Sequence, residues 1–135
     1  MTKTKYMLDT SAVKDLIHGQ NPTIRKRLLE VPMANICISA ITETELRRSA
    51  LQHPQAEKLS AIIREFLLHV EILPWDSKAA ITHAELTTTF KKEGLSLNYI
   101  DLLIAAHSKS EGTVLITTSN DFSKIKKHAS FEIWS

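Results

Sequence analysis

Short apolar runs alternate with longer amphipathic stretches along the whole chain. The short runs are rich in β-branched and other large apolar residues, which is typical of buried strands. The predicted strands are Tyr6–Leu8, Asn35–Ala40, Glu71–Leu73, Thr113–Thr117 and Phe131–Trp134. The longer stretches have a different spacing, which predicts helices between the strands.

In those longer stretches the apolar residues recur three or four positions apart, as on one face of a helix. The predicted helices are Ser11–His18, Pro22–Val31, Thr42–His53, Pro54–Val70, Ser77–Lys92, Asn98–Lys109 and Ser119–Lys127. Gly19 and Gly94 follow two of these helices as stop signals, and Asp76 is placed to cap a third. Strands that alternate with helices or helix pairs predict a parallel sheet covered on both faces.

Composition and charge narrow the class of protein without naming a function. A chain of 135 residues, 43% of them hydrophobic, predicts one domain (1–135) with a core of its own. No segment is apolar and long enough to cross a membrane, so no membrane partner is expected. The single cysteine, Cys37, cannot form an internal disulfide, which predicts a core role in a reducing cytoplasm. The net charge of +2 is compatible with a nucleic-acid partner but does not argue for one.

Three carboxylates stand where predicted strands end or helices begin. Asp9 directly follows the first strand, Glu45 lies in the first turn after the second strand, and Asp101 opens the helix before the fourth. Because parallel strands end at one edge of a sheet, these side chains are expected to meet in one crevice. Helix N-termini offset only part of their repulsion, whereas Mg²⁺ and Mn²⁺ prefer oxygen ligands. The pattern therefore predicts a divalent metal site that could activate water against a phosphodiester.

Each carboxylate also fits a structural role at a helix start. Thr42 and Glu45 have the spacing of a capping box. Asn98 stands at the same spacing from Asp101, and Asp9 could itself be an N-cap. The two roles are compatible, because a first-turn carboxylate can serve both. A free charge directly after an apolar strand is costly, which favours the metal role for Asp9.

Four segments together resemble the PIN-domain ribonucleases, and more narrowly the VapC toxins of bacterial toxin–antitoxin pairs. They are Met7–Ser11, Ile38–Leu46, Asp101–His107 and Leu115–Phe122, in the family's order and spacing and across nearly the whole chain. Each segment alone is weakly specific, whereas the combination is much more so. The resemblance implies an α/β fold of the PIN type, with three α/β/α layers around a central parallel sheet of about five strands.

The resemblance also implies an activity and partners. It implies an Mg²⁺- or Mn²⁺-dependent endoribonuclease that cuts structured RNA, often tRNA, and acts as a toxin. It further implies a cognate VapB-type antitoxin that blocks the active site, and a homodimer. By position, Asp9, Glu45 and Asp101 match the three acidic residues of the family's catalytic metal site. Ser11 matches a small polar residue that helps to order this site.

The fourth segment departs from the family's pattern. Ser119 stands where the family usually has Asp or Asn, and Asp121 is the next acid. A serine hydroxyl can hold a metal-bound water but adds no charge, so one or two metal ions are possible. Asp121 is then either a supporting residue of the site or only a cap of the last helix. The departure leaves a second hypothesis open, a PIN-fold module that binds RNA or a protein without cutting.

The basic residues nearest to the acidic site are candidates for contact with RNA phosphates. Arg47 and Arg48 follow Glu45 within one helical turn. Arg47 is also placed to pair with Glu43, four residues earlier on the same helix face. Further basic clusters at Arg25–Arg27, Lys91–Lys92 and Lys124–Lys127 suggest a nucleic-acid partner, although each also fits a solvated helix face.

Overall fold

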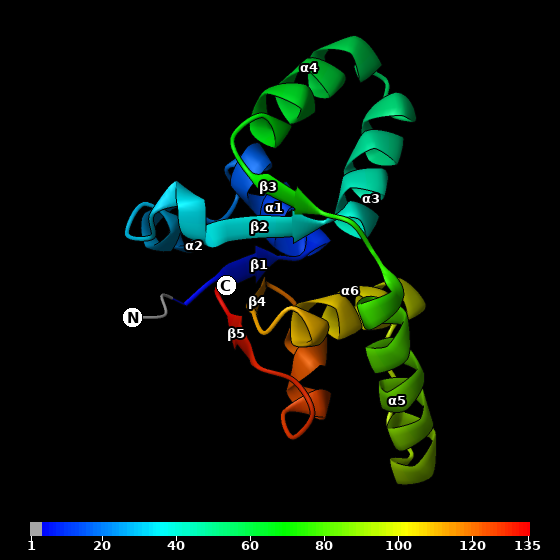
Figure 1. The fold of residues 1–135 in the computed structure, drawn as a ribbon. Helices are drawn as coiled ribbons and strands as arrows, with labels where there is room; N and C mark the ends of the chain where they lie inside the picture. Colours follow the sequence, from blue (N-terminus) through cyan, green and yellow to red (C-terminus); the bar gives the residue numbers. More distant parts are fainter. Residues whose placement is uncertain (1–3) are drawn as a thin grey trace.

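The protein is built around one parallel sheet of five strands in the order β3-β2-β1-β4-β5 (Figure 1). The computed structural model describes residues 4–135, and residues 1–3 of the predicted domain lie outside it. The strands are β1 (Tyr6–Leu8), β2 (Ile36–Ser39), β3 (Glu71–Leu73), β4 (Val114–Thr117) and β5 (Phe131–Ile133). All neighbours pair in parallel, with β1 at the centre between β2 and β4. The predicted α/β fold is confirmed.

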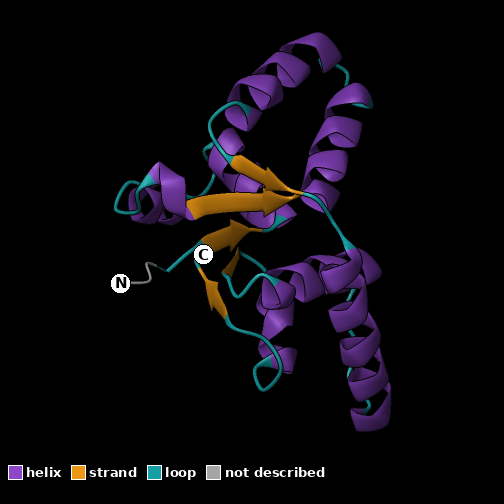
Figure 2. Cartoon of the chain, viewed as in Figure 1, coloured by secondary structure: helices purple, strands orange, loops and turns teal. Residues whose placement is uncertain are grey.

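Helices cover both faces of this sheet (Figure 2). They are α1 (Thr10–His18), α2 (Pro22–Leu28), α3 (Ala40–Leu51), α4 (Ala56–Leu67), α5 (Ser77–Glu93) and α6 (Tyr99–Ser110), with short 3₁₀ helices η1 (Met33–Asn35) and η2 (Asn120–Ile125). Helices α3 and α4 pack as a pair, and so do α5 and α6. Within residues 4–135 no helix combines the length and apolar character that crossing a bilayer requires.

The core consists of two apolar clusters, one on each face of the sheet, because successive strand residues point to opposite sides. Leu8, Ile38 and Ile116 pack toward α1, α2 and α4. The alternate positions Met7 and Leu115, together with Cys37, pack toward α5, α6 and η2. The core role predicted for Cys37 is confirmed, and burial raises the pKa of its thiol to about 11.

Several element boundaries differ from the predicted ones. Helix α2 ends at Leu28 rather than at Val31, and η1 follows before β2. Helix α4 covers 56–67 rather than 54–70, and the segment after β4 forms a 3₁₀ helix instead of an α-helix. Helix α3 begins two residues earlier than predicted because Ser39 is its N-cap, with its Oγ accepting from the Ile41 N–H over 3.0 Å. This last shift changes the setting of Glu45.

Candidate metal centre

Asp9 lies at the carboxyl end of β1 and is the N-cap of α1, as predicted. Its Oδ1 accepts hydrogen bonds from the Ala12 N–H at 2.8 Å and from the Ser11 hydroxyl at 2.7 Å. The residue is 1% exposed, and within residues 4–135 no cation pairs with it. Burial raises the pKa of Asp9, and hydrogen bonds from Thr117, Ala12 and Ser11 oppose that rise. Asp9 is therefore a rigidly held carboxylate whose charge lacks a counter-ion.

A chain of hydroxyl groups joins the start of α1 to the end of β4. Ser11 Oγ donates to Asp9, lies 3.3 Å from Thr117 Oγ1 and accepts from the Thr118 N–H at 3.1 Å. Thr117 is fully buried and accepts from the Ser119 N–H at 3.0 Å. Thr117 was not predicted as a site residue. It could have been recognised in the sequence as a polar residue at the end of an apolar strand. These contacts fix Asp9 from two elements of the sheet edge.

Glu45 is held by side chains rather than by a helix terminus. The Thr10 hydroxyl donates to Glu45 Oε1 over 2.5 Å, and Arg48 Nη2 lies 3.6 Å from Oε2. Because α3 begins at Ala40, Glu45 lies in its second turn. The predictions that Glu45 is a first-turn residue and that Thr42 caps the helix are therefore wrong. The contact with Thr10 ties α3 to the residue next to Asp9.

Asp101 lies in the first turn of α6, as predicted. Asn98 caps this helix, with its Oδ1 accepting from the N–H groups of Ile100 at 3.0 Å and Asp101 at 3.4 Å. The pKa of Asp101 is raised from 3.8 to about 6, first by burial and then by the charges of Asp9, Glu45 and Asp121. The mutual effect means that these four carboxylates share one region at the carboxyl edge of the sheet.

Ser119 and Asp121 take different positions at the start of η2. Ser119 is the N-cap, and its Oγ accepts from the Asp121 N–H at 3.2 Å. Asp121 is therefore not the cap of this helix, which was one of the two roles considered for it. Its charge contributes to the raised pKa of Asp101 instead.

Both arginines considered for RNA contact are engaged with acids of their own helix. Arg47 Nε donates to Glu43 Oε2 at 3.0 Å, which confirms the predicted i, i+4 pair. Arg48 forms the longer contact with Glu45. Their guanidinium groups lower the negative charge beside the site and are only partly available to another anion.

The oxygen-rich donor set fits a hard divalent ion that keeps part of its water shell. Within residues 4–135 no three acidic, histidine or cysteine side chains are grouped tightly enough to ligate one ion directly. Mg²⁺ usually binds one or two carboxylates directly and retains several waters, which does not require three direct protein ligands. Asp9 without a cation and Asp101 with its raised pKa supply the charge that such an ion would compensate.

Comparisons with known proteins place this architecture in a family. The model of the PIN domain matches residues 6–128. The tRNA(fMet)-specific endonuclease VapC of Salmonella typhimurium is 30% identical over 122 residues, which cover 90% of this chain and 92% of that protein. Ribonuclease VapC2 of Haemophilus influenzae is 32% identical over 115 residues, which cover 85% of this chain and 86% of the relative.

A solved structure agrees with these sequence matches. The crystal structure of DNA-bound VapBC from Salmonella typhimurium contains a chain that is 29% identical, with a TM-score of 0.90 over 98% of this chain and 100% of that one. The matches extend through all the segments that carry Asp9, Glu45 and Asp101. The chain therefore belongs to the PIN domain family and, within it, to the VapC-type ribonuclease toxins.

Proposed function

We propose that this VapC-type endoribonuclease cuts tRNA with a Mg²⁺ or Mn²⁺ ion held by Asp9, Glu45 and Asp101. The observation that carries the proposal is the convergence of Asp9, Glu45 and Asp101 at one edge of the sheet, where Thr10, next to Asp9, donates to Glu45. Burial and the charges of Asp9, Glu45 and Asp121 together raise the pKa of Asp101 to about 6, in agreement with this arrangement. Such an accumulation of negative charge at one sheet edge is explained by a cation that is part of the working enzyme. tRNA is favoured as substrate because relatives from Salmonella typhimurium and Shigella flexneri are named as tRNA(fMet)-specific endonucleases.

The three acids have separate parts in this proposal. Asp9 is held in place by Ser11 and by the Ala12 N–H, so it is a ligand that needs no reorganisation. Thr10 positions Glu45 in the same way. Asp101, whose pKa burial and the neighbouring carboxylates raise to about 6 in the metal-free protein, would face the same ion and gain most from its charge. When bound, the ion would polarise the scissile phosphate and stabilise the charge that develops on its oxygens.

A VapB-type antitoxin is the proposed protein partner, as in the VapBC structures of relatives. The surface that suits it is an apolar hollow of about 230 Å³ formed by α1, α2 and α4, with Leu29, Met33 and Phe66 among its lining residues. Leu29 is 80% exposed and Met33 is 51% exposed, which is unusual for large apolar side chains unless a partner covers them. Leu29→Asp should abolish co-purification with the antitoxin and leave tRNA cutting intact. We also propose that the protein forms a homodimer and is located in the cytoplasm.

The alternative is a PIN-fold module that holds RNA without cutting it. Ser119 favours this alternative, because its hydroxyl is used in capping η2 and adds no charge to the site. Asp121 supplies a nearby charge instead, as its effect on Asp101 indicates. Removal of the metal ion distinguishes the two functions, because it should stop cutting by a nuclease, whereas a binding module does not cut with or without the ion.

The deciding experiment is cleavage of total tRNA by purified, antitoxin-free protein. Cutting with Mg²⁺ should stop in EDTA, and Asp101→Asn should lower the rate by at least about a hundredfold. Glu85→Gln, on the exposed face of α5, is the matched control and should cut at the wild-type rate. Cutting that persists in EDTA would contradict the metal site. Binding of tRNA without any cutting would favour the module.

A further inference from the structure

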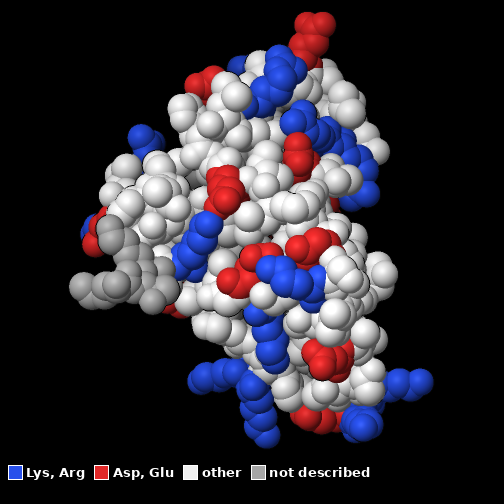
Figure 3. All heavy atoms as spheres, in the orientation of Figure 1, with Lys and Arg blue, Asp and Glu red and all other residues white. Residues whose placement is uncertain are grey.

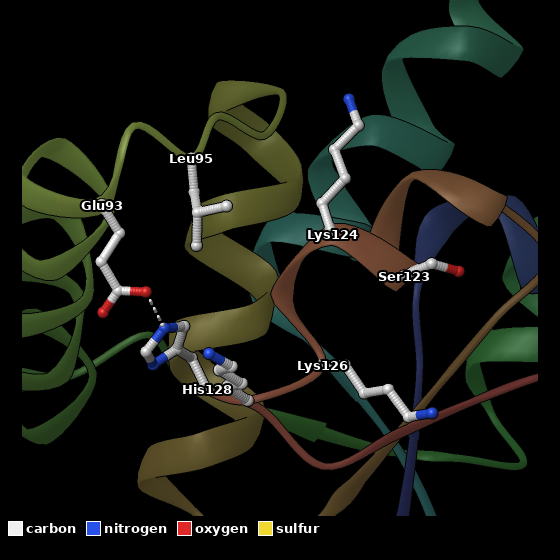
Figure 4. A pocket seen from close by; sticks show the side chains of 7 residues that line it. Glu93, Leu95, Ser123, Lys124, Lys126 and His128 are labelled. Carbon is white, nitrogen blue, oxygen red and sulfur yellow. Dashed lines mark hydrogen bonds and ion pairs between the residues drawn. The ribbon is translucent and has the colours of Figure 1, made fainter.

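A basic hollow of about 350 Å³ lies between the end of α5 and the segment after β4 (Figure 4). It is lined by Glu93, Leu95, Ser123, Lys124, Lys126, Lys127 and His128. The helix η2 contributes residues both to this hollow and to the acidic site. Asp121 in its first turn acts on Asp101, and Lys124 follows three residues later in the same helix. The hollow is thus separate from the proposed metal centre but adjoins it along the chain.

The three lysines of this hollow are exposed and carry uncompensated charge. Within residues 4–135 none of Lys124, Lys126 and Lys127 takes part in an ion pair, in contrast to Arg47 and Arg48. Figure 4 shows the amino groups of Lys124 and Lys126 pointing away from each other. Figure 3 shows basic side chains projecting from this end of the molecule, around η2 and the end of α5.

Among the described residues that line the hollow, Glu93 is the one acid, and its carboxylate contacts a histidine instead of the lysines. Glu93 Oε1 lies 3.0 Å from His128 Nε2, so its charge is directed at the imidazole. The same histidine packs on Phe90 with ring centroids 5.8 Å apart, and its carbonyl accepts from Lys109 Nζ at 2.8 Å. These contacts fasten the turn that carries the lysines to α5 and α6. The backbone of the turn that carries the lysines is therefore held in a fixed position.

The spacing along this turn suits a strand of nucleic acid that runs through the metal centre. A 3₁₀ helix rises about 2 Å per residue, so Lys124 and Lys127 stand roughly 6 and 12 Å along the chain from Asp121. The turn continues beyond η2, because the His128 N–H donates to the Ile125 carbonyl at 2.9 Å. Lys124 and Lys127 can therefore contact phosphates within a few nucleotides of the one at the acidic site.

We propose that Lys124, Lys126 and Lys127 form a phosphate-binding surface for the RNA backbone on one side of the scissile bond. The inference rests on the proposed function, since the scissile phosphate is taken to lie at the acidic site. Lysines bind phosphates as point charges and read no bases. This lysine surface therefore sets the affinity and the position of the RNA strand, while the choice of sequence is made elsewhere.

The test compares two variants with the same change of charge. Lys124→Gln with Lys127→Gln removes two charges from the lysine surface, and Lys26→Gln with Lys58→Gln removes two exposed charges from α2 and α4. We would measure KM and kcat for tRNA cutting over a range of salt concentrations. The dissociation constant for uncut tRNA would be measured with the same pairs of substitutions in the Asp101→Asn background. Thermal melts would show that each variant is folded.

Each lost phosphate contact should lower the log–log salt slope by about 0.7 and weaken binding about fourfold at about 0.15 M salt. The Lys124/Lys127 variant should therefore raise KM and the dissociation constant about 15-fold and lower the slope by about 1.4. Its kcat should stay within about twofold, because no group at the reacting phosphate changes. The Lys26/Lys58 variant should change each quantity by less than about twofold.

Equal losses in both variants would overturn the inference, because net charge alone would then explain them. Normal tRNA affinity combined with weaker antitoxin binding would also overturn it and assign the lysine surface to the protein partner. A wild-type protein that binds tRNA through these lysines but never cuts it would refute the proposed function and support the inference. A wild-type protein that neither binds nor cuts tRNA would overturn both.

Discussion

Asp101→Asn should make the metal-free protein more stable while it abolishes cutting. The carboxylate of Asp101 is half-buried and lies near the charges of Asp9, Glu45 and Asp121. Without a metal ion this repulsion destabilises the folded state at neutral pH. Asparagine keeps the shape and removes the charge, so the substitution relieves the repulsion and removes the proposed metal ligand in one step.

The magnitude follows from the pKa of Asp101. A rise from 3.8 to about 6 corresponds to roughly 3 kcal/mol against the ionised form, at about 1.36 kcal/mol per pKa unit. Because the group is only half-buried, solvent screening reduces this to about 1–2 kcal/mol. Loss of the favourable interaction between Asp101 and the N-terminus of α6 subtracts a few tenths of a kcal/mol more. A gain of about 1 kcal/mol or more should remain, which raises Tm by about 3–8 °C.

The assay is thermal or urea unfolding of both proteins in EDTA at two pH values. The folded pKa of Asp101, about 6, lies above its unfolded value of about 3.9, so its stabilising contribution is complete below pH 4 and is lost as pH rises through 6. The advantage of the variant should therefore be largest at pH 7.5 and shrink by about half at pH 5. Excess Mg²⁺ should reverse the order, because it stabilises the protein with the intact site.

Two results would refute this reasoning. The first is a metal-free variant that is no more stable than wild type at pH 7.5, which would show that the carboxylates do not repel one another. The second is an advantage that does not change between pH 7.5 and pH 5, which would show that ionisation of Asp101 is not its cause. Glu85→Gln controls for the loss of an exposed charge and should stay within about 0.5 kcal/mol of wild type.

Three further predictions concern the hydroxyl contacts and the buried thiol. Thr10→Val removes the donor that positions Glu45 and should slow single-turnover cutting about tenfold, with Tm little changed. Ser11→Ala leaves the Thr118 N–H without its acceptor and should cost about 1–2 kcal/mol in urea unfolding; an unchanged stability would contradict that network. Cys37, with a pKa of about 11, should resist iodoacetamide at pH 8 until urea unfolds the protein, as mass spectrometry would show.

The parts of the site that depend on local pattern could be predicted from the sequence. Asp9 was recognisable because an apolar run stops there, and Asp101 because a cap and an apolar helix surround it. Both positions follow from rules that act within a few residues. The same holds for the alternation of strands and helices, which was enough to predict a parallel sheet.

Contacts between distant residues could not be predicted in this way. Thr10 and Glu45 are 35 positions apart, and their hydrogen bond depends on how β1 and β2 are aligned. The choice of Ser39 over Thr42 as the cap of α3 was equally out of reach, because both residues suit a cap locally. The contact between Glu93 and His128 joins residues 35 positions apart and was out of reach for the same reason, so the sequence left both interpretations of Lys124–Lys127 open.

The central position of β1 has a consequence for synthesis on the ribosome. Asp9 is synthesised well before β4, yet its own N–H donates to the carbonyl of Ile116, and Ser11 accepts from the N–H of Thr118. A nascent chain that stops before residue 114 therefore has every helix through α6 but no β4 to hold the N-terminal acid in place. Translation thus delays assembly of the cutting site until most of the chain has been made. We therefore expect a chain that lacks β4 to be inactive against RNA, which would spare the RNA that translation uses until the toxin is nearly complete.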